Sequence, residues 1–327
     1  MRGLLVLMLA GVARASPEAA LQAQLELAAA RSPATVGIYV EQMETHERAA
    51  VNALRPFPLA STFKLPLAVL VLDAVERKVL PPLETRVRVL ERDLVPGVSP
   101  LYDRAPTGSE VSLLELVQLL LEPGDNSAAN ALIRMLGGTD RMRAAQETLS
   151  LQGFSVDRDE TELMMASTGA SLSRAAATPE RIKAALAKLT PTQRDVALQR
   201  FRADSGDHGT PRAMAQVLAR IVRGELLTPE HRALLLEELA KNGRCGNRIG
   251  GGLPAGTVVS DRTGTCAGPD GTHSLCVNDV GVVMLPQGGH LLVPVYVEDG
   301  GEETAVKEKV IANVARLAFG AYAAGKR

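Results

Sequence analysis

The sequence predicts an α/β (α+β) protein in which an antiparallel sheet, built from both chain termini and flanked by helices, carries an inserted all-helical lobe. Three observations predict this class. Runs rich in β-branched residues lie near both termini, helical patterns flank those runs, and almost every segment between them has helical periodicity. The sheet is expected to have about five strands, which is an ordinary number for one sheet. The predicted strands are residues 35–40, 47–54, 257–260, 277–285 and 290–297.

The first residues are typical of a secretory signal. Arg2 provides a positive start, residues 4–12 are apolar, and the Ala-Arg-Ala of residues 13–15 is a small-x-small cleavage site. A short buried helix is the alternative interpretation. The apolar run is too short to span a bilayer, and no cysteine lies near the cleavage site to carry a lipid. We therefore expect residues 1–15 to be a signal peptide and the protein to be exported, periplasmic or secreted, without a membrane anchor.

Helices are expected next to the sheet at residues 17–30 and 302–324. In the middle of the chain, Thr-Pro pairs predict helix starts, because threonine caps a helix and proline fits its first turn. Thr190 with Gln193 also forms a capping box. The pairs are Thr178-Pro179, Thr190-Pro191, Thr210-Pro211 and Thr228-Pro229.

The sequence favours a single catalytic domain over residues 16–327. Its sheet part is expected at about 16–54 and 255–327, and its helical part at about 55–254. Two sequential domains are the alternative, but no low-complexity linker and no internal repeat supports them.

Composition limits the partners. Lys and Arg number 36 and Asp and Glu number 37, so no overall field attracts nucleic acid or an anionic membrane. The five histidines lack metal-ligand spacing, and no phosphate loop or Gly-x-Ser-x-Gly elbow is present. We expect no metal, no cofactor and no nucleic-acid partner.

The three cysteines would lie in a compartment that permits disulfides. Cys266 and Cys276 flank a Gly-Pro-Asp-Gly turn between two predicted strands. A bridge between them would stabilise the fold by about 2–3 kcal/mol for so short a loop. Cys245 would then remain free. Three reduced thiols are the alternative.

Ser61 and Lys64 form the only Ser-x-x-Lys motif in the chain. The helix that follows is apolar on every side, so we expect it to be buried. A lysine three positions after the serine lies over the same helix face. Serine needs an adjacent base to act as a nucleophile, and a buried lysine loses part of its proton affinity. A plain helix N-cap is the alternative role for Ser61.

Asn126 begins an Ala- and Leu-rich helical pattern, directly after Gly124 and Asp125. Asp125 and Asn126 are ordinary cap residues in one interpretation. In the other, the amide of Asn126 binds a substrate carbonyl.

Arg262 and Thr263 follow a predicted strand and would offer a cation and a hydroxyl to an anionic group. Gly264 lets a ligand approach the backbone, and the N–H of Thr265 would point into a cleft. An edge strand with a turn is the alternative.

Taken in this order and spacing, the three segments resemble the serine β-lactamase and penicillin-binding family, which carries Ser-x-x-Lys, Ser-Asp-Asn and Lys-Thr-Gly motifs. The resemblance covers nearly the whole mature chain. It implies that Ser61 is acylated with Lys64 beside it, and that Asn126, Arg262, Thr263 and Thr265 bind the substrate.

A fourth segment resembles class A of that family. Glu160 would be the base that activates the deacylating water, and Arg158 would pair with Asp207 to brace an omega-like loop over residues 158–210. Arg248 is similar to an arginine that supports binding of the substrate carboxylate, although a surface salt bridge is the alternative. A bidentate guanidinium suits such a group.

The chain departs from the family pattern at four places. Arg262 replaces the lysine of the third motif, a substitution that is also found among class A enzymes. Gly124 stands where the family has a serine that passes a proton to the lactam nitrogen; an ordered water or the Thr263 hydroxyl are candidates to replace it. Met164 replaces an asparagine that helps to hold the deacylating water. The loop of residues 158–210 is longer than usual, with two extra helices expected, and is either a wall of the cleft or a surface elaboration.

The resemblance implies hydrolysis of β-lactams through a serine acyl-enzyme. The alternatives are a D-Ala-D-Ala peptidase of the penicillin-binding kind, against which Glu160 argues, and a β-lactam-binding protein with little turnover, which Gly124 and Met164 favour.

Overall fold

The computed structural model describes residues 16–104, 107–241, 246–266, 268 and 272–323. The predicted signal peptide, residues 1–15, and Cys245 lie outside the described residues.

The predicted antiparallel sheet is confirmed and is built from both ends of the chain. Six strands rather than five are present, because Pro294 interrupts the last predicted strand. Proline has no N–H to donate, and the chain divides there into two short strands. Across the sheet the order is β2, β1, the β9–β10 pair, β8 and β7. The strands are β1 (Thr35–Gln42), β2 (Glu47–Val51), β7 (Val259–Cys266), β8 (Cys276–Met284), β9 (His290–Leu292) and β10 (Val295–Glu298).

β7 is longer than the sequence predicts. Its pairing with β8 continues through Arg262 and Thr263 to Cys266, beyond the expected end at residue 260. The polar residues there do not follow the alternation of a half-buried strand, because both faces of β7 are covered and the burial pattern runs almost unbroken. The candidate site residues of this segment therefore lie within the sheet.

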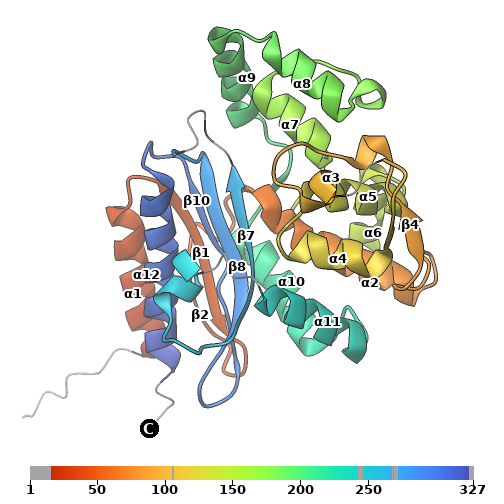
Figure 1. Cartoon of the computed structure of the whole chain (residues 1–327). Helices are drawn as coiled ribbons and strands as arrows, with labels where there is room; N and C mark the ends of the chain where they lie inside the picture. The colour runs from red at the N-terminus through yellow and green to blue at the C-terminus, as the bar shows by residue number, and fades with distance from the viewer. Residues whose placement is uncertain (1–15, 105–106, 242–245, 267, 269–271, 324–327) are drawn as a thin grey trace, which may run out of the picture.

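Helices α1 (Pro17–Arg31) and α12 (Thr304–Tyr322) cover one face of the sheet, as Figure 1 shows. Apolar residues of the two helices and the strands form a core in which Ile38, Val295 and Ile311 have no exposed surface. Both chain ends thus contribute one helix and part of the sheet to the same layer.

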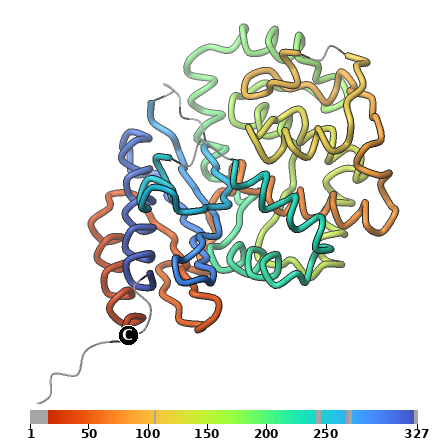
Figure 2. The backbone as a smooth tube through the Cα atoms, turned by 60° about the horizontal axis from the view of Figure 1, so that its bottom comes forward, coloured from red at the N-terminus to blue at the C-terminus, as the bar shows by residue number. Residues whose placement is uncertain are grey.

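The other face of the sheet carries the inserted lobe, whose separation from α1 and α12 is also visible in Figure 2. Its core extends onto the sheet through Val280 and Tyr296. The lobe is helical as predicted, and in addition holds a ribbon of β4 (Arg86–Arg88) with β5 (Glu110–Ser112). Its helices are α2 (Lys64–Glu76), α3 (Pro100–Arg104), α4 (Leu113–Leu121), α5 (Asn126–Leu136), α6 (Thr139–Thr148), α7 (Glu160–Thr168), α8 (Pro179–Ala187), α9 (Pro191–Ala203), α10 (Pro211–Arg223) and α11 (Pro229–Ala240).

Each of the four Thr-Pro pairs begins a helix. The threonine side chain accepts a hydrogen bond from the backbone N–H three residues later in α8, α9, α10 and α11. Thr190 and Gln193 form the predicted capping box. Local chemistry therefore determines where these helices start, whichever part of the protein they pack on.

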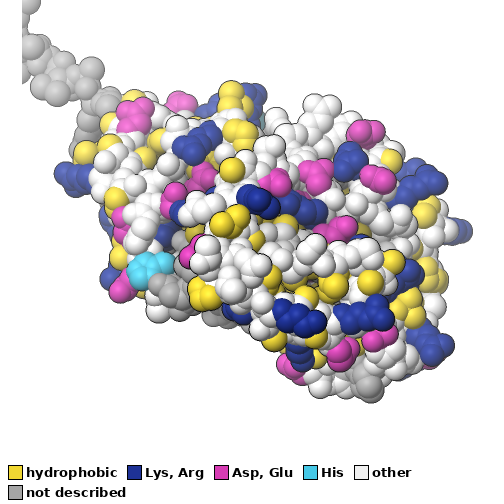
Figure 3. Space-filling model, turned by 90° about the horizontal axis from the view of Figure 1, so that it is seen from above, with side chains coloured by type: hydrophobic (Ala, Val, Ile, Leu, Met, Phe, Trp, Pro, Cys, Tyr) yellow, Lys and Arg dark blue, Asp and Glu magenta, His cyan; other side chains and the backbone are white. Residues whose placement is uncertain are grey.

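Helices α7, α8 and α9 form the inserted loop and extend beyond the rest of the lobe (Figure 1). Met165 and Ile182 belong to a small separate hydrophobic cluster that holds α7 and α8 together. Seen from above in Figure 3, basic and acidic side chains are interspersed on the drawn face, and neither sign gathers into one patch.

Candidate active site

A cavity of about 470 Å³ lies between the edge of the sheet at β7 and the helical lobe. Its lining brings together residues from segments far apart in the chain. Among them are the predicted site residues Ser61, Asn126, Arg158, Glu160, Asp207, Arg262, Thr263 and Thr265, and also Gly124 and Met164.

Ser61 lies in the short 3-10 helix η1 (Ala60–Phe63), directly before α2. Ala60 has a left-handed backbone with φ of 46°, which is uncommon for a residue with a side chain and marks a sharp turn at the serine. β7 packs closely against this turn. A Cβ on Gly264 would lie 2.9 Å from the carbonyl oxygen of Leu59 and 3.1 Å from the nitrogen of Thr62, so only glycine fits there.

Lys64 begins α2 and has no exposed surface. Its Nζ lies 3.2 Å from Ser61 Oγ, 2.9 Å from the Gly124 carbonyl oxygen and 2.5 Å from Asn126 Oδ1. It also lies 2.7 Å from Glu160 Oε1. Burial lowers the pKa of Lys64, the charge of Glu160 opposes that change, and the charge of Arg262 adds to it. Of the four oxygen neighbours, only the Ser61 hydroxyl has a proton to donate to a neutral amine.

Glu160 is the first residue of α7, where the helix dipole favours a carboxylate. Its helix start is secured by a capping box in which Asp159 accepts from the N–H of Glu162 and Glu162 accepts from the N–H of Asp159. The Glu160 side chain is 11% exposed. The carboxylate of Glu160 is therefore largely buried and lies against Lys64 instead of in solvent.

Asn130 is a site residue that the sequence reasoning missed. It is buried in α5, its Oδ1 accepts from the N–H of Glu160 at 2.9 Å, and its Nδ2 donates to Thr161 Oγ1 at 2.9 Å. Asn126 and Asn130 are four residues apart and therefore share a face of α5. That spacing was the available signal, and through it one helix contacts both Lys64 and Glu160.

Asp125 and Asn126 have different roles: Asp125 is a helix cap, and Asn126 lies at the cavity. Asp125 is the buried N-cap of α5, and its carboxylate accepts a hydrogen bond from the N–H of Ala128. It also accepts hydrogen bonds from the hydroxyl of Ser99 and the N–H of Leu101. Asn126 instead turns its side-chain oxygen to Lys64 and borders the cavity.

Arg262 crosses from β7 to the helical lobe. Its Nε donates to the Ser61 carbonyl at 3.2 Å and its Nη1 donates to the Leu121 carbonyl at 2.8 Å. The guanidinium fills the space beside Gly124, where a Cβ would lie 2.0 Å from Arg262 Nη2. Because the guanidinium already occupies this space, it argues against an ordered water there, which was one of the two candidates to replace the serine hydroxyl.

Arg248 is placed differently from the other predicted binding residues. It lies behind β7, is not among the described residues that line the cavity, and donates to the carbonyls of Gly264 and Asn278 at 3.0 and 2.8 Å. Its Nη2 donates to Thr265 Oγ1 at 2.7 Å. Arg248 contacts the cavity lining from behind, at Gly264 and Thr265. The salt bridge that it also makes, to Glu308, has little exposed surface.

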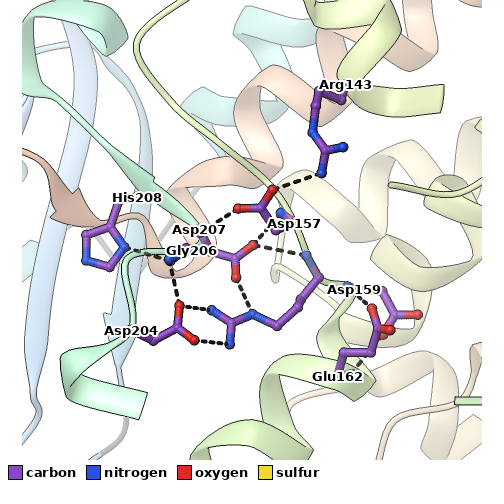
Figure 4. A network of polar contacts seen from close by, with 9 residues as sticks. Arg143, Asp157, Asp159, Glu162, Asp204, Gly206, Asp207 and His208 are labelled. Atoms are coloured by element: carbon purple, nitrogen blue, oxygen red, sulfur yellow. Dashed lines mark hydrogen bonds and ion pairs between the residues drawn. The ribbon is translucent and has the colours of Figure 1, made fainter. Parts of the chain in front are cut away.

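Arg158 and Asp207 join the two ends of the inserted loop, as Figure 4 shows for the surrounding network. Arg158 Nε donates to Asp207 Oδ2 at 2.6 Å, while Asp207 Oδ1 accepts the N–H groups of Asp157 and Arg158. The other guanidinium nitrogens of Arg158 bond Asp204. The expected pair is therefore formed, and it is largely buried, since the Arg158 and Asp207 side chains are only 19% and 11% exposed.

The loop insertion supplies part of the cavity wall through Phe201 and Arg202 of α9. The Arg158 guanidinium lies over the Phe201 ring, 5.5 Å from its centroid. Arg202 forms an ion pair with Asp299, which follows β10 and also borders the cavity. Of the two interpretations of the insertion, this arrangement favours a wall of the cleft.

Cys266 and Cys276 occupy paired positions of β7 and β8 and are joined by a disulfide. Cys266 also borders the cavity. The bridge closes the end of the β7–β8 hairpin beside Thr265, so it limits how far this wall of the cavity can open.

Two kinds of feature are absent from the described residues. No helix among them is long and apolar enough to cross a membrane. Within the same residues, no group of three or more His, Cys, Asp or Glu side chains is arranged to hold a metal ion.

Known proteins share this fold and cover nearly the whole chain. The Beta-lactamase enzyme family matches residues 18–322. The chain is similar to Extended-spectrum beta-lactamase PER-1 of Pseudomonas aeruginosa, with 27% identity over 305 residues that cover 91% of this chain and 86% of that protein. It is also similar to the carbapenem-hydrolyzing beta-lactamase KPC of Klebsiella oxytoca, with 28% identity over 285 residues, or 87% and 83% of the two chains.

Solved structures agree with these matches. A beta-lactamase from Chitinophaga pinensis superposes with a TM-score of 0.76 at 26% identity, covering 92% of this chain and 99% of that chain. An ancestral class A beta-lactamase superposes with a TM-score of 0.73 at 29% identity, covering 92% of this chain and 100% of that chain.

Proposed function

The chain belongs to the β-lactamase enzyme family, class A, and from this premise we propose that it hydrolyses β-lactams through an acyl-enzyme on Ser61. The observation that carries the proposal is the position of Lys64, whose Nζ lies 3.2 Å from Ser61 Oγ and 2.7 Å from Glu160 Oε1. A nucleophile and two groups able to accept protons thus meet at one buried point of the cavity wall.

Acylation forms a bond between Ser61 Oγ and the lactam carbonyl carbon. The serine proton passes to Lys64 Nζ or, through a water, to Glu160. Burial lowers the pKa of Lys64 and so favours the neutral amine that the first route requires. The backbone N–H groups of Ser61 and Thr265 are proposed to stabilise the oxyanion, and one such donor was worth about 2.7–4 kcal/mol in a comparable enzyme.

Release of the lactam nitrogen needs one proton as its bond to the carbonyl carbon breaks. Gly124 has no hydroxyl to relay it, and a guanidinium does not deprotonate in proteins, so Arg262 cannot supply it. The proton that Lys64 received from Ser61 is then delivered to the nitrogen, directly or through the Thr263 hydroxyl. One proton has moved from Ser61 to the nitrogen.

Substrate binding is proposed to use both walls of the cavity. Asn126 offers its amide to a substrate carbonyl, while Arg262 and Thr263 face the substrate carboxylate. Arg248 supports that end of the site by holding the Thr265 hydroxyl from behind. Arg158 and Asp207 brace the loop that carries Glu160.

Deacylation is proposed to use Glu160 as the base. A water oxygen bonds to the acyl carbon, the bond to Ser61 Oγ breaks, and the water proton passes through Glu160 back to the serine. Met164 lies one helical turn after Glu160 and borders the cavity, where its thioether is a poor partner for that water.

A chromogenic cephalosporin combined with intact mass measurement tests the proposal. Sustained colour formation with Ser61 regenerated supports hydrolysis. A stable covalent adduct without turnover would instead indicate a binding protein or a peptidase of the penicillin-binding kind. If folded protein gives no colour and forms no adduct, the proposal is contradicted. An unchanged rate in Ser61→Ala would contradict it as well.

We further propose that residues 1–15 are a signal peptide, that the protein acts outside the cytoplasm, and that residues 16–327 form one monomeric catalytic unit. The small-x-small site at residues 13–15 supports the cleavage. N-terminal sequencing of the expressed protein from periplasm and medium, with its mass in solution, checks these points; an uncleaved cytoplasmic protein or a stable oligomer would contradict them.

A further inference from the structure

The guanidinium of Arg262 fills the space that a side chain at position 124 would occupy. Gly124 has φ of +87°, and a Cβ built on it would lie 2.0 Å from Nη2 of Arg262 and 2.8 Å from both Cζ and Nη1. These separations are far inside van der Waals contact. A side chain at position 124 and the guanidinium of Arg262 therefore exclude each other in this structure.

The guanidinium is held in that space by two segments of the helical lobe. Its Nε donates to the Ser61 carbonyl in η1 and its Nη1 donates to the Leu121 carbonyl at the end of α4. Arg262 is only 2% exposed, so both hydrogen bonds are shielded from water. One side chain from β7 thereby ties the turn of the nucleophile to the turn that contains Gly124.

The Gly124 turn also holds the proton acceptor. The carbonyl of Gly124 accepts from Lys64 Nζ at 2.9 Å, and Asn126 accepts from the same nitrogen at 2.5 Å. The distance between Ser61 and Lys64 therefore depends on how the turn after α4 is placed relative to η1. Arg262 bonds to η1 and to the end of α4, and so adds a second link between these segments beside Lys64.

We propose that Gly124 and Arg262 are a matched pair, in which the guanidinium takes the place of a side chain at 124 and positions Ser61 for acylation. Arg262 acts in this step as a positioning residue. The inference deepens the proposed acylation at Ser61 and rests on it. It requires a forked guanidinium, because the single ammonium of lysine does not present two fixed donors on separate nitrogens.

Chemical rescue tests this pair. The rate of adduct formation is measured by intact mass in Arg262→Ala and in Gly124→Ala/Arg262→Ala, with and without guanidinium at concentrations below those that unfold the protein. Loss of two charge-assisted hydrogen bonds is expected to slow acylation of Arg262→Ala by about 10²-fold or more. Guanidinium is expected to restore about tenfold or more of that rate, because the space beside Gly124 is then open to it.

The double variant keeps the cavity of the missing arginine but adds a Cβ where Nη2 would sit. Guanidinium is therefore expected to give it no rescue. For each variant, the acylation rate with guanidinium is divided by the rate without it. Backbone strain from alanine at a positive φ enters both rates and therefore does not change this ratio. Methylammonium and sodium chloride at equal ionic strength are controls for charge. Arg77→Ala, at an exposed arginine directly after α2, is a control for unspecific effects.

A second comparison keeps the protein's charge constant. Arg262→Lys leaves more room beside position 124. The fold-loss of acylation rate caused by Gly124→Ser is therefore expected to be smaller in the Arg262→Lys background than in the wild type, by about tenfold or more. The midpoint of thermal unfolding is measured for every variant, so that only folded proteins are compared.

Three results would overturn the inference: equal rescue of both alanine backgrounds, no rescue of folded Arg262→Ala, or additive losses in the lysine comparison. Each leaves wild-type acylation intact. Failure of the proposed function is a separate result, since wild-type protein would then form no adduct at all.

Discussion

At the scale of single residues, the proposed chemistry depends on Lys64, which has four oxygen neighbours and no exposed surface. The spacing of Ser61 and Lys64 on one helix start could be deduced from the sequence, because three residues along a helix return to the same face. The contact with Glu160 could not. It depends on α5, where Asn126 contacts Lys64 and Asn130 accepts from the backbone N–H of Glu160.

Replacing Glu160 by glutamine separates the two halves of the proposed cycle. Glu160→Gln removes the base for the deacylating water, so deacylation should slow by about 10²–10⁴-fold and the Ser61 adduct should accumulate. Intact mass after mixing with substrate measures it. Glu162→Gln is the matched control, because glutamine keeps the capping box of the same helix start. Equal behaviour of the two variants would exclude the assigned role of Glu160.

Met164 is expected to limit the second half of the cycle. In Met164→Asn, an amide can hold the water near Glu160, so deacylation should accelerate by up to about tenfold, the worth of one neutral hydrogen bond. Single-turnover decay of the adduct measures the rate, and Met164→Leu, which fills the space without a polar atom, is the control. A deacylation rate in Met164→Asn at or below that of Met164→Leu would argue against this explanation.

At the scale of elements, the sequence predicted where the helices of the inserted loop begin but not where they pack. Its helices α8 and α9 each begin at a Thr-Pro pair, since capping is decided by residues within one turn. The position of α9 beside the cavity was undecidable from that information. It is set by contacts between distant residues, including Arg158 with Phe201 and Arg202 with Asp299.

Asp204 and Asp207 provide a matched test of how the loop is held. Asp207→Asn should lower the free energy of unfolding by about 1.5–3 kcal/mol, because a buried carboxylate that accepts two N–H groups and Arg158 is replaced. Asp204→Asn should lower it by under about 1 kcal/mol, since Asp204 is a more exposed partner of the same arginine. Urea unfolding measures both.

Deacylation should follow the same order in these variants, because the loop carries Glu160. Asparagine tolerates the left-handed backbone of Asp207, so the comparison isolates charge from backbone strain. A larger loss of stability or of deacylation in Asp204→Asn would contradict the assigned brace.

At the scale of the whole molecule, the sheet joins two cores. One lies under α1 and α12, and the other extends from the sheet into the helical lobe. Between them, polar groups are buried within the sheet itself. Asp279 has no exposed surface, and burial raises its pKa to about 6, although the charge of Arg248 and the N–H of Ile249 oppose that change.

Asp279 should make stability depend on pH in a definite direction. Its pKa is raised in the folded protein, so between about pH 4 and pH 6 the native state binds more protons than the unfolded chain. Its contribution is fully present at the acid end of that window and is lost as pH rises through about 6. The loss corresponds to about 3 kcal/mol at most.

Asp279→Asn, which does not titrate, should therefore have a flatter dependence of unfolding free energy on pH from about 4 to 7 than the wild type. Urea unfolding at several pH values measures it. Parallel curves for the two proteins would show that Asp279 is not the group responsible, whatever their absolute stabilities.

The sequence by itself determined the features that depend on neighbours along the chain: the strands near both termini, the capped helix starts, and the pairing of Ser61 with Lys64 at the start of a buried helix. Tertiary structure alone decided which side chains share a space. The guanidinium beside Gly124, Asn130 behind Glu160, and the withdrawal of Arg248 behind β7 all join residues tens to hundreds of positions apart. Periodicity and capping report only on contacts within a few residues, whereas close packing between segments appears when the chain is folded.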